Sequence, residues 1–394
     1  MLTTSGEGDE SAYEVRSGGG IPEGSDPYTI PDVENFDVPV QKDGEHRLWV
    51  YEGGAGYGRA VLFNGDTGQM LGQMETGWIG TEVVMPTGSD LLFNQALYMS
   101  RGYRGEATNI LELFDRKTLR AAGEIPLPAQ KLGGMPSLNH TGSTDDGAFG
   151  ILQFLTPASS VGIANLEDKS FASRIETAGC AYVFPAGDRR FFTLCGDGSI
   201  LVITLDDSGA EADRERVSGI FDAQNDPLHG TGVRVGDIWY FVTHRGDVHT
   251  IDVGGETLAH AQPWSFKEEN EGRAWVPAEM IQNLAVHGPS GTLIVMLADA
   301  DLALKGGGTD FHRKPGTQLR AYDVETGELK YDTALDGISF AMAVSQDAEP
   351  LLYANNVTSP NISVFDALTG TKSYEISGEG IDQVTHISIV EPGQ

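Results

Sequence analysis

The sequence predicts an all-β fold, a seven-bladed β-propeller, on three observations. One strand-and-turn pattern recurs along the chain, its copies lie about 50 residues apart on average, and the apolar runs around it are short. A spacing of about 40 to 50 residues is typical of four-stranded propeller blades. Runs of roughly four to eight apolar residues, as in Trp239–Val242 and Leu293–Leu297, indicate strands, whereas helical repeats require a 3.6-residue period.

The recurring pattern is a strand that ends at an acidic or amide residue and continues into a tight turn. The clear copies are Leu62–Gly68, Leu113–Thr118, Ala321–Gly327 and Val364–Gly370. Weaker copies lie between the second and third of these. The predicted strand ends are Asn64, Asp115, Asn165, Leu205, Asp252, Asp323 and Asp366.

The last repeat shows the four strands of a blade most clearly. They are predicted at Phe340–Val344, Pro350–Asn355, Ile362–Asp366 and Lys372–Ser377. The first repeat, Leu48–Glu75, supplies only three strands, and the C-terminal Val384–Val390 is a strand without a blade of its own. We therefore expect the C-terminal strand to complete the first blade, because closing the ring removes two open sheet edges.

Length and charge agree with a repetitive protein that binds neither nucleic acid nor membranes. The chain has 394 residues, more than one hydrophobic core usually serves, and its longest apolar runs fall far short of a membrane span. It carries 26 Lys and Arg against 57 Asp and Glu, a formal net charge of −31 that would repel phosphate groups. Such an acidic surface either keeps the protein soluble in salt or attracts a basic partner, and the sequence does not distinguish these two explanations.

The N-terminal segment has a different composition from the repeats. Residues Met1–Asp26 are rich in Gly, Ser and Glu and lack the apolar core of a signal peptide. We predict a flexible acidic, Gly-rich arm over residues 1–40 and the propeller over residues 41–394. If the protein is exported, its signal is already missing from this sequence.

Two cysteines flank a predicted hairpin. Its turn is expected at Gly187-Asp188, and in that register Cys180 lies opposite Cys195, within reach of a disulfide. The alternative is a pair of buried reduced thiols. Because opposed cysteines rarely arise by chance, we expect the disulfide and hence an oxidising compartment such as a bacterial periplasm.

Catalytic motifs are sparse. The run Gly53–Gly58 resembles a phosphate-binding loop but is followed by a strand, so it is predicted to be a hairpin loop. The nine histidines are scattered, and no convergent set of His and carboxylates is evident for a site in the central channel. The insertion Ala298–Thr317 carries potential cation ligands, but their spacing fits no calcium or zinc motif, and a solvated loop is favoured over a metal site. These potential ligands are Asp299, Asp301, Asp310 and His312.

From about Arg47 to the C-terminus, the chain resembles the large (heavy) subunit of quinoprotein amine dehydrogenases, whose members are methylamine and aromatic amine dehydrogenases. No single motif is diagnostic, but the similar stretches occur in a consistent order. They are Arg101–Gly105 with Leu111–Asp115, Thr156–Ile163, Ala178–Ser199, Pro263–Ser265 and Trp275–Pro277.

The resemblance implies a division of labour between two subunits. In this family the large subunit is a propeller without a cofactor, and a small, disulfide-rich subunit carries tryptophan tryptophylquinone. Two of each form a tetramer that oxidises a primary amine to an aldehyde and ammonia in the periplasm. Electrons pass to a cupredoxin of the amicyanin or azurin type or to a cytochrome c. Methylamine is the expected substrate; the alternatives are an aromatic amine dehydrogenase subunit and a non-catalytic periplasmic binding propeller.

The resemblance also singles out one residue near the chemistry. Family members place an aromatic residue, phenylalanine, on the loop that enters the second blade, where it narrows the substrate channel. The matching segment here is Thr76–Gly80, which puts Trp78 at that position. The bulkier indole should favour a small amine, although it could instead stack on an aromatic substrate. An ordinary packing role for Trp78 is the simpler alternative.

Two arginines are weaker candidates. Arg101 and Arg104 lie on a predicted blade-edge loop and could pair with acidic groups of the small subunit. Ala107 and Asn109 stand where the family carries Arg and Asp, so this surface is altered. Exposed ion pairs contribute little, typically under about 1 kcal/mol, and the assignment is correspondingly weak.

Overall fold

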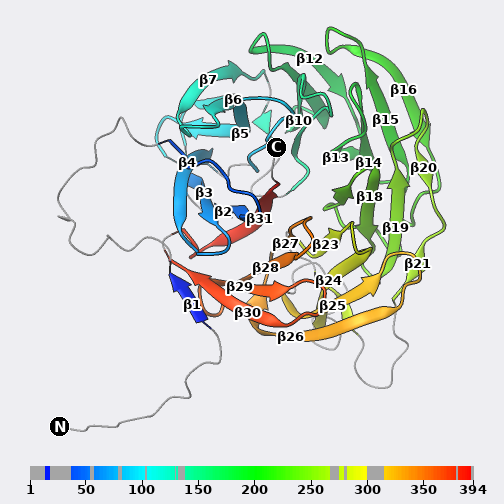
Figure 1. The fold of residues 1–394 in the computed structure, drawn as a ribbon. Coiled ribbons are helices and arrows are strands. Elements are labelled where there is room, and N and C mark those ends of the chain that lie inside the picture. The colour runs from blue at the N-terminus through cyan, green and yellow to red at the C-terminus, as the bar shows by residue number, and fades with distance from the viewer. Residues whose placement is uncertain are drawn as a thin grey trace, which may run out of the picture.

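The structure is a computed structural model that describes residues 14–17, 37–53, 57–78, 82–102, 104–128, 130–131, 138–266, 275–278, 282–299, 315–378 and 380–391. Within these residues the secondary structure consists of strands, and they form seven sheets arranged around an axis (Figure 1). The predicted seven-bladed β-propeller is confirmed. In the same part of the chain no helix is long and apolar enough to cross a membrane.

The first four blades follow the chain from its N-terminal side. From the inner to the outer strand, blade 1 is β31 (Val384–Val390), β2 (Arg47–Glu52), β3 (Tyr57–Asn64) and β4 (Met70–Trp78); blade 2 is β5 (Leu91–Met99), β6 (Ala107–Asp115) and β7 (Ala121–Pro126); blade 3 is β9 (Thr141–Ser143) with β8 (Gln130–Lys131), β10 (Phe149–Thr156), β11 (Ser160–Asn165) and β12 (Ser170–Glu176); blade 4 is β13 (Cys180–Pro185), β14 (Arg190–Cys195), β15 (Ile200–Leu205) and β16 (Glu211–Val217).

The remaining blades complete the circle. Blade 5 is β17 (Val233–Val235), β18 (Ile238–Val242) and β19 (Asp247–Asp252), followed by β20 (Ala259–His260) and β21 (Trp264–Ser265); blade 6 is β23 (Leu284–His287) with β22 (Trp275–Pro277), β24 (Thr292–Asp299), β25 (Gly316–Asp323) and β26 (Leu329–Ser339); blade 7 is β27 (Met342–Val344), β28 (Leu351–Asn356), β29 (Asn361–Asp366) and β30 (Lys372–Ser377). In addition, β1 (Glu14–Ser17) pairs in parallel with β30. It lies within the segment predicted to be a flexible arm.

Each predicted strand end is the last residue of the third strand counted from the axis, from Asn64 in β3 to Asp366 in β29, when the isolated bridge of Val84 to Phe93 is counted as the innermost strand of blade 2. In six blades the side chain at this position caps the turn that follows; in blade 4 the residue after Leu205, Asp206, does so. In blade 7, Asp366 Oδ1 accepts hydrogen bonds from Leu368 N at 2.8 Å and Thr369 N at 3.0 Å. Gly370 then takes a φ of 71°, which glycine adopts without strain. The recurring sequence pattern is therefore a capped turn.

The C-terminal strand closes the ring as predicted. β31 pairs antiparallel with β2, from Arg47 opposite Val390 to Glu52 opposite Val384, and Figure 1 shows the two strands side by side. Ile387 of β31 and Val50 of β2 are fully buried in the core between blades 1 and 7. Every blade contributes one face to such a core with its neighbour, so the hydrophobic core runs around the ring.

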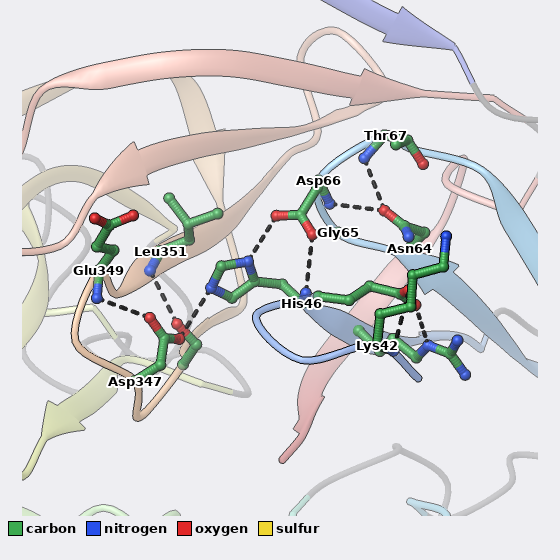
Figure 2. Close-up of polar contacts among 12 residues, drawn as sticks. Lys42, His46, Asn64, Gly65, Asp66, Thr67, Asp347, Glu349 and Leu351 are labelled. Atoms are coloured by element: carbon green, nitrogen blue, oxygen red, sulfur yellow. Dashed lines mark hydrogen bonds and ion pairs between the residues drawn. The ribbon is translucent and has the colours of Figure 1, made fainter. Parts of the chain in front are cut away.

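A polar contact reinforces the same junction on the face where the third strands end. His46, just before β2, lies with Nδ1 2.6 Å from Asp66 Oδ1 and with Nε2 2.9 Å from Asp347 Oδ2. Asp66 belongs to the β3–β4 turn of blade 1 and Asp347 to the β27–β28 turn of blade 7. Figure 2 shows the imidazole between the two carboxylates.

The predicted Cys180–Cys195 disulfide is present, with an S–S distance of 2.08 Å, but the hairpin around it differs from the prediction. Ala186 N donates to Arg190 O, so the turn encloses three residues, Gly187–Arg189, instead of the predicted two. The register shifts between Ala181 and Phe184, which restores Cys180 opposite Cys195. Tyr182, at the shift, has a φ of 67°. The extra residue in the turn and the one-residue register shift in β13 offset each other, so Cys180 still lies opposite Cys195 although the predicted turn was wrong.

Candidate functional site

Three sequence-predicted features lie on one face of the ring. In each blade the second strand ends, the third begins and the fourth ends on the same side, because neighbouring strands are antiparallel. Trp78 ends β4 opposite Tyr57, which begins β3; Cys195 ends β14; and the turn from Arg101 to Arg104 joins β5 to β6. We call this side the Trp78 face. His46 lies on the opposite face.

The backbone that leads to Trp78 is held against blade 2. Asn94 Nδ2 donates to Thr76 O at 3.1 Å, and both residues are buried. Gly77 has a φ of 72°, and a Cβ there would lie 3.2 Å from the backbone of Leu97, so neither the conformation nor the space suits a larger residue. Trp78 itself is half-buried, and within the described residues its buried Nε1 has no hydrogen-bond partner. Residues 79–81 of the predicted loop lie outside the described residues.

Both candidate arginines are exposed. Arg101 N donates to Arg104 O at 3.0 Å, which forms the tight β5–β6 turn. Neither side chain is in an ion pair within the described part of the chain. They are free to contact another protein, but no feature of this turn assigns them a partner.

The insertion Ala298–Thr317 lies mostly outside the described residues, including Asp301, Asp310 and His312. Three of the four cation ligands considered from the sequence are therefore not placed, and the fourth, Asp299, ends β24. Among the residues that the structure describes, no three His, Cys, Asp or Glu side chains are grouped to hold a metal ion.

A cluster of polar residues near the axis was missed from the sequence. The His386 ring on β31 stacks on Tyr51 of β2, with ring centroids 3.9 Å apart. Asn139 N donates to Glu82 Oε1 at 3.1 Å, which joins blades 2 and 3. His140, next to Asn139, stacks on Tyr182 of blade 4 at 5.4 Å. His140 and His386, two of the histidines scattered along the sequence, are close enough in the ring to interact electrostatically.

Burial keeps this cluster largely uncharged at neutral pH. Loss of hydration raises the pKa of Glu82 to about 8, although hydrogen bonds from backbone N–H groups at Asn139 and Thr141 oppose the shift. Burial, with the nearby His140, lowers the pKa of His386 to about 3. A protonated carboxyl and a neutral imidazole are thus the forms expected near pH 7. These residues could have been found by aligning the innermost strands of the seven blades with one another, but several of those strands have only three residues.

Below the cluster the axis is hollow. A cavity of about 320 Å³, which we call the axial hollow, is lined by blades 1 to 5, including Glu82, Asn139 and Ser388. At its far end Arg234 forms a two-point ion pair with Asp145, at 2.7 and 2.8 Å. A second cavity continues along blades 5, 6, 7 and 1 and shares Arg234 and Ser388 with the first.

Known proteins share this fold and, in one family, the sequence. A putative 6-phosphogluconolactonase from Bacteroides fragilis superposes with a TM-score of 0.57 at 13% identity, covering 90% of this chain and 100% of its own, which shows the fold alone. The methylamine dehydrogenase heavy chain of Methylorubrum extorquens is 28% identical over 345 residues, 85% of this chain and 80% of the relative. That of Paracoccus versutus is 28% identical over 331 residues, 82% and 75% of the two chains. Residues 47–389 match the methylamine dehydrogenase heavy chain family, and the chain belongs to that family.

Proposed function

We propose that this chain is the large, cofactor-free subunit of a periplasmic amine dehydrogenase that acts on methylamine. The observation that carries the proposal is the family match over residues 47–389, which spans all seven blades. The partner is a small subunit that carries tryptophan tryptophylquinone, in a tetramer with two copies of each chain. When bound in the small subunit, the quinone supplies the oxidation of the primary amine to an aldehyde and ammonia.

This chain's contribution is to hold the small subunit and to shape the route of the amine. Trp78 supports that role, because its half-buried ring ends β4 on a backbone fixed by Asn94 and Gly77. A rigidly anchored indole can narrow an opening at a subunit interface, and a narrow opening selects small amines.

Trp78 is also compatible with a second class of substrate, an aromatic amine. The face of an indole ring stacks favourably on an aromatic ring, so Trp78 is also compatible with an aromatic amine dehydrogenase. Activity of the assembled complex against methylamine, longer alkylamines and phenylethylamine separates the two. The highest kcat/KM for methylamine supports the proposal, and the highest for the aromatic amine supports the alternative.

The electron acceptor is proposed as a cupredoxin or a cytochrome c, and the disulfide supports an oxidising compartment. The decisive experiment is a search beside the coding sequence of this chain for a short, cysteine-rich chain, followed by co-expression of the two. We expect a complex that absorbs visible light, turns over primary amines and reduces one of the two acceptors. A colourless, inactive chain that binds no small subunit would instead favour a stand-alone binding propeller.

A further inference from the structure

The axial hollow contains a carboxyl group that can serve as the counter-ion of a bound cation when it is ionised. Its charged lining residues are Glu82, Asp145 and Arg234. Asp145 and Arg234 neutralise each other through their two-point ion pair. Burial raises the pKa of Glu82 to about 8, so the charge of its carboxyl can change near neutral pH when a ligand arrives. The formal net charge of −31 raises the local concentration of cations around the whole chain.

The walls of the hollow indicate the kind of cation. Ser388 and Asn139 add oxygen atoms to the same lining, where Ser388 Oγ is hydrogen-bonded to Tyr51 and Asn139 Oδ1 accepts from Gly232 N. Val83, Val183 and Trp239 provide apolar surface. An ammonium group needs several oxygen acceptors, and a short alkyl group needs apolar contacts. A volume of about 320 Å³ accommodates a small amine with a few waters.

We propose that the axial hollow binds a small protonated primary amine, with the Glu82 carboxylate as its counter-ion and Ser388 and Asn139 as further acceptors. This site lies within the large subunit itself, between blades 1 to 5. It goes beyond the proposed function, since binding here requires neither the small subunit nor amine oxidation.

Binding in this hollow is coupled to proton release. Water reaches part of the Glu82 side chain, but the surrounding blades remove most of the hydration that would stabilise its charge, and the pKa of Glu82 rises to about 8. A cation requires the ionised form, so each molecule bound near pH 6.5 displaces about one proton. Below pH 8 the affinity should therefore rise by about tenfold per pH unit.

The test is calorimetric titration of the purified full chain with methylammonium chloride at pH 6.5 and pH 8, in two buffers of different ionisation heat. We expect saturable binding of one molecule, proton release near one at pH 6.5, and tighter binding at pH 8. Glu82→Gln, which resembles the protonated side chain, should abolish binding. Glu124→Gln, on the exposed outer strand of blade 2, is the matched control and should bind as wild type does.

A second variant keeps the test decisive if Glu82→Gln fails to fold. Ser388→Ala removes one acceptor and should weaken methylammonium binding by roughly five- to tenfold. Equal binding by wild type and both variants would overturn the proposal, as would saturable binding of potassium chloride with the same affinity. The titration uses no small subunit, so the two proposals are tested independently. If methylammonium does not bind, the amine dehydrogenase proposal is unaffected. If the chain proves not to be an amine dehydrogenase subunit, the proposed binding site is unaffected.

Discussion

His46 of blade 1 lies 2.9 Å from Asp347 of blade 7, so a single imidazole joins the first and last blades of the ring (Figure 2). Its other ring nitrogen contacts Asp66 at 2.6 Å. The hydrogen bond to Asp66 raises the pKa of His46, with further contributions from the charges of Asp66 and Asp347, and burial opposes the shift. When protonated, the ring donates to both carboxylates, and when neutral it can donate to only one.

This contact should stabilise the ring at acidic pH. Because the folded-state pKa of His46 is raised, its contribution is complete below the unfolded pKa of about 6.5 and is lost as pH rises through the folded value. His46→Gln should lower the free energy of unfolding by roughly 1 kcal/mol at pH 6 and by much less at pH 9. Urea denaturation at the two pH values measures this.

A double-mutant cycle separates this contact from its surroundings. The charged groups that influence the pair also include Glu391, while Glu349 N donates to Asp347. His46→Gln and Asp347→Asn should be coupled at pH 6 and independent at pH 9. Equal coupling at both pH values would show that the carboxylates do not act through the imidazolium.

Closure of the ring by β31 makes a second prediction. Removal of Val384–Gln394 exposes the edge of β2 and the core residues that pack on Ile387, so the shortened chain should aggregate or remain unfolded. Removal of Pro392–Gln394 leaves β31 whole and is the control. Circular dichroism and size-exclusion chromatography report the result, and a folded, monomeric protein without β31 would contradict the assigned closure.

The disulfide makes the third prediction. Cys180→Ser with Cys195→Ser should lower the free energy of unfolding by about 3 kcal/mol, because a cross-link over 15 residues restricts the unfolded chain. Dithiothreitol should shift the thermal midpoint of wild type toward that of the double variant and leave the variant unchanged. A wild-type midpoint that does not respond to complete reduction would show that the disulfide does not stabilise blade 4.

The sequence predicted the outer part of each blade better than the inner part. Third strands end at a capped turn, and the side chain that caps it, as at Asp366, is visible in the sequence. The innermost strands carry no such signal: β9, β17 and β27 have three residues each. Glu82, His140 and His386 meet near the axis from distant parts of the chain, and only the closed ring brings them together.

The hairpin of blade 4 shows a second limit of sequence-based prediction. A two-residue turn was expected because Gly187 favours it, yet the hydrogen bond from Ala186 N to Arg190 O encloses three residues. Tyr182 absorbs the difference in a left-handed conformation. Its ring packs against Gly230, where a Cβ would lie 2.1 Å from Tyr182 Cζ. The contact comes from blade 5, and a local pattern could not reveal it.

Trp78 makes the last prediction. If its indole narrows the route of the amine, Trp78→Ala in the assembled complex should raise kcat/KM for longer alkylamines relative to methylamine by about tenfold. Trp78→Phe restores the residue expected at this position and should give an intermediate preference. Trp264→Ala, on blade 5, is the control, because its half-buried indole packs against Gly327, away from blades 1 and 2.

The form of the kinetic change distinguishes a channel residue from a structural one. Loss of packing alone would lower the thermal midpoint and reduce turnover of every amine by the same factor. A residue that lines the route changes KM and the order of preference among amines while the midpoint stays near that of wild type.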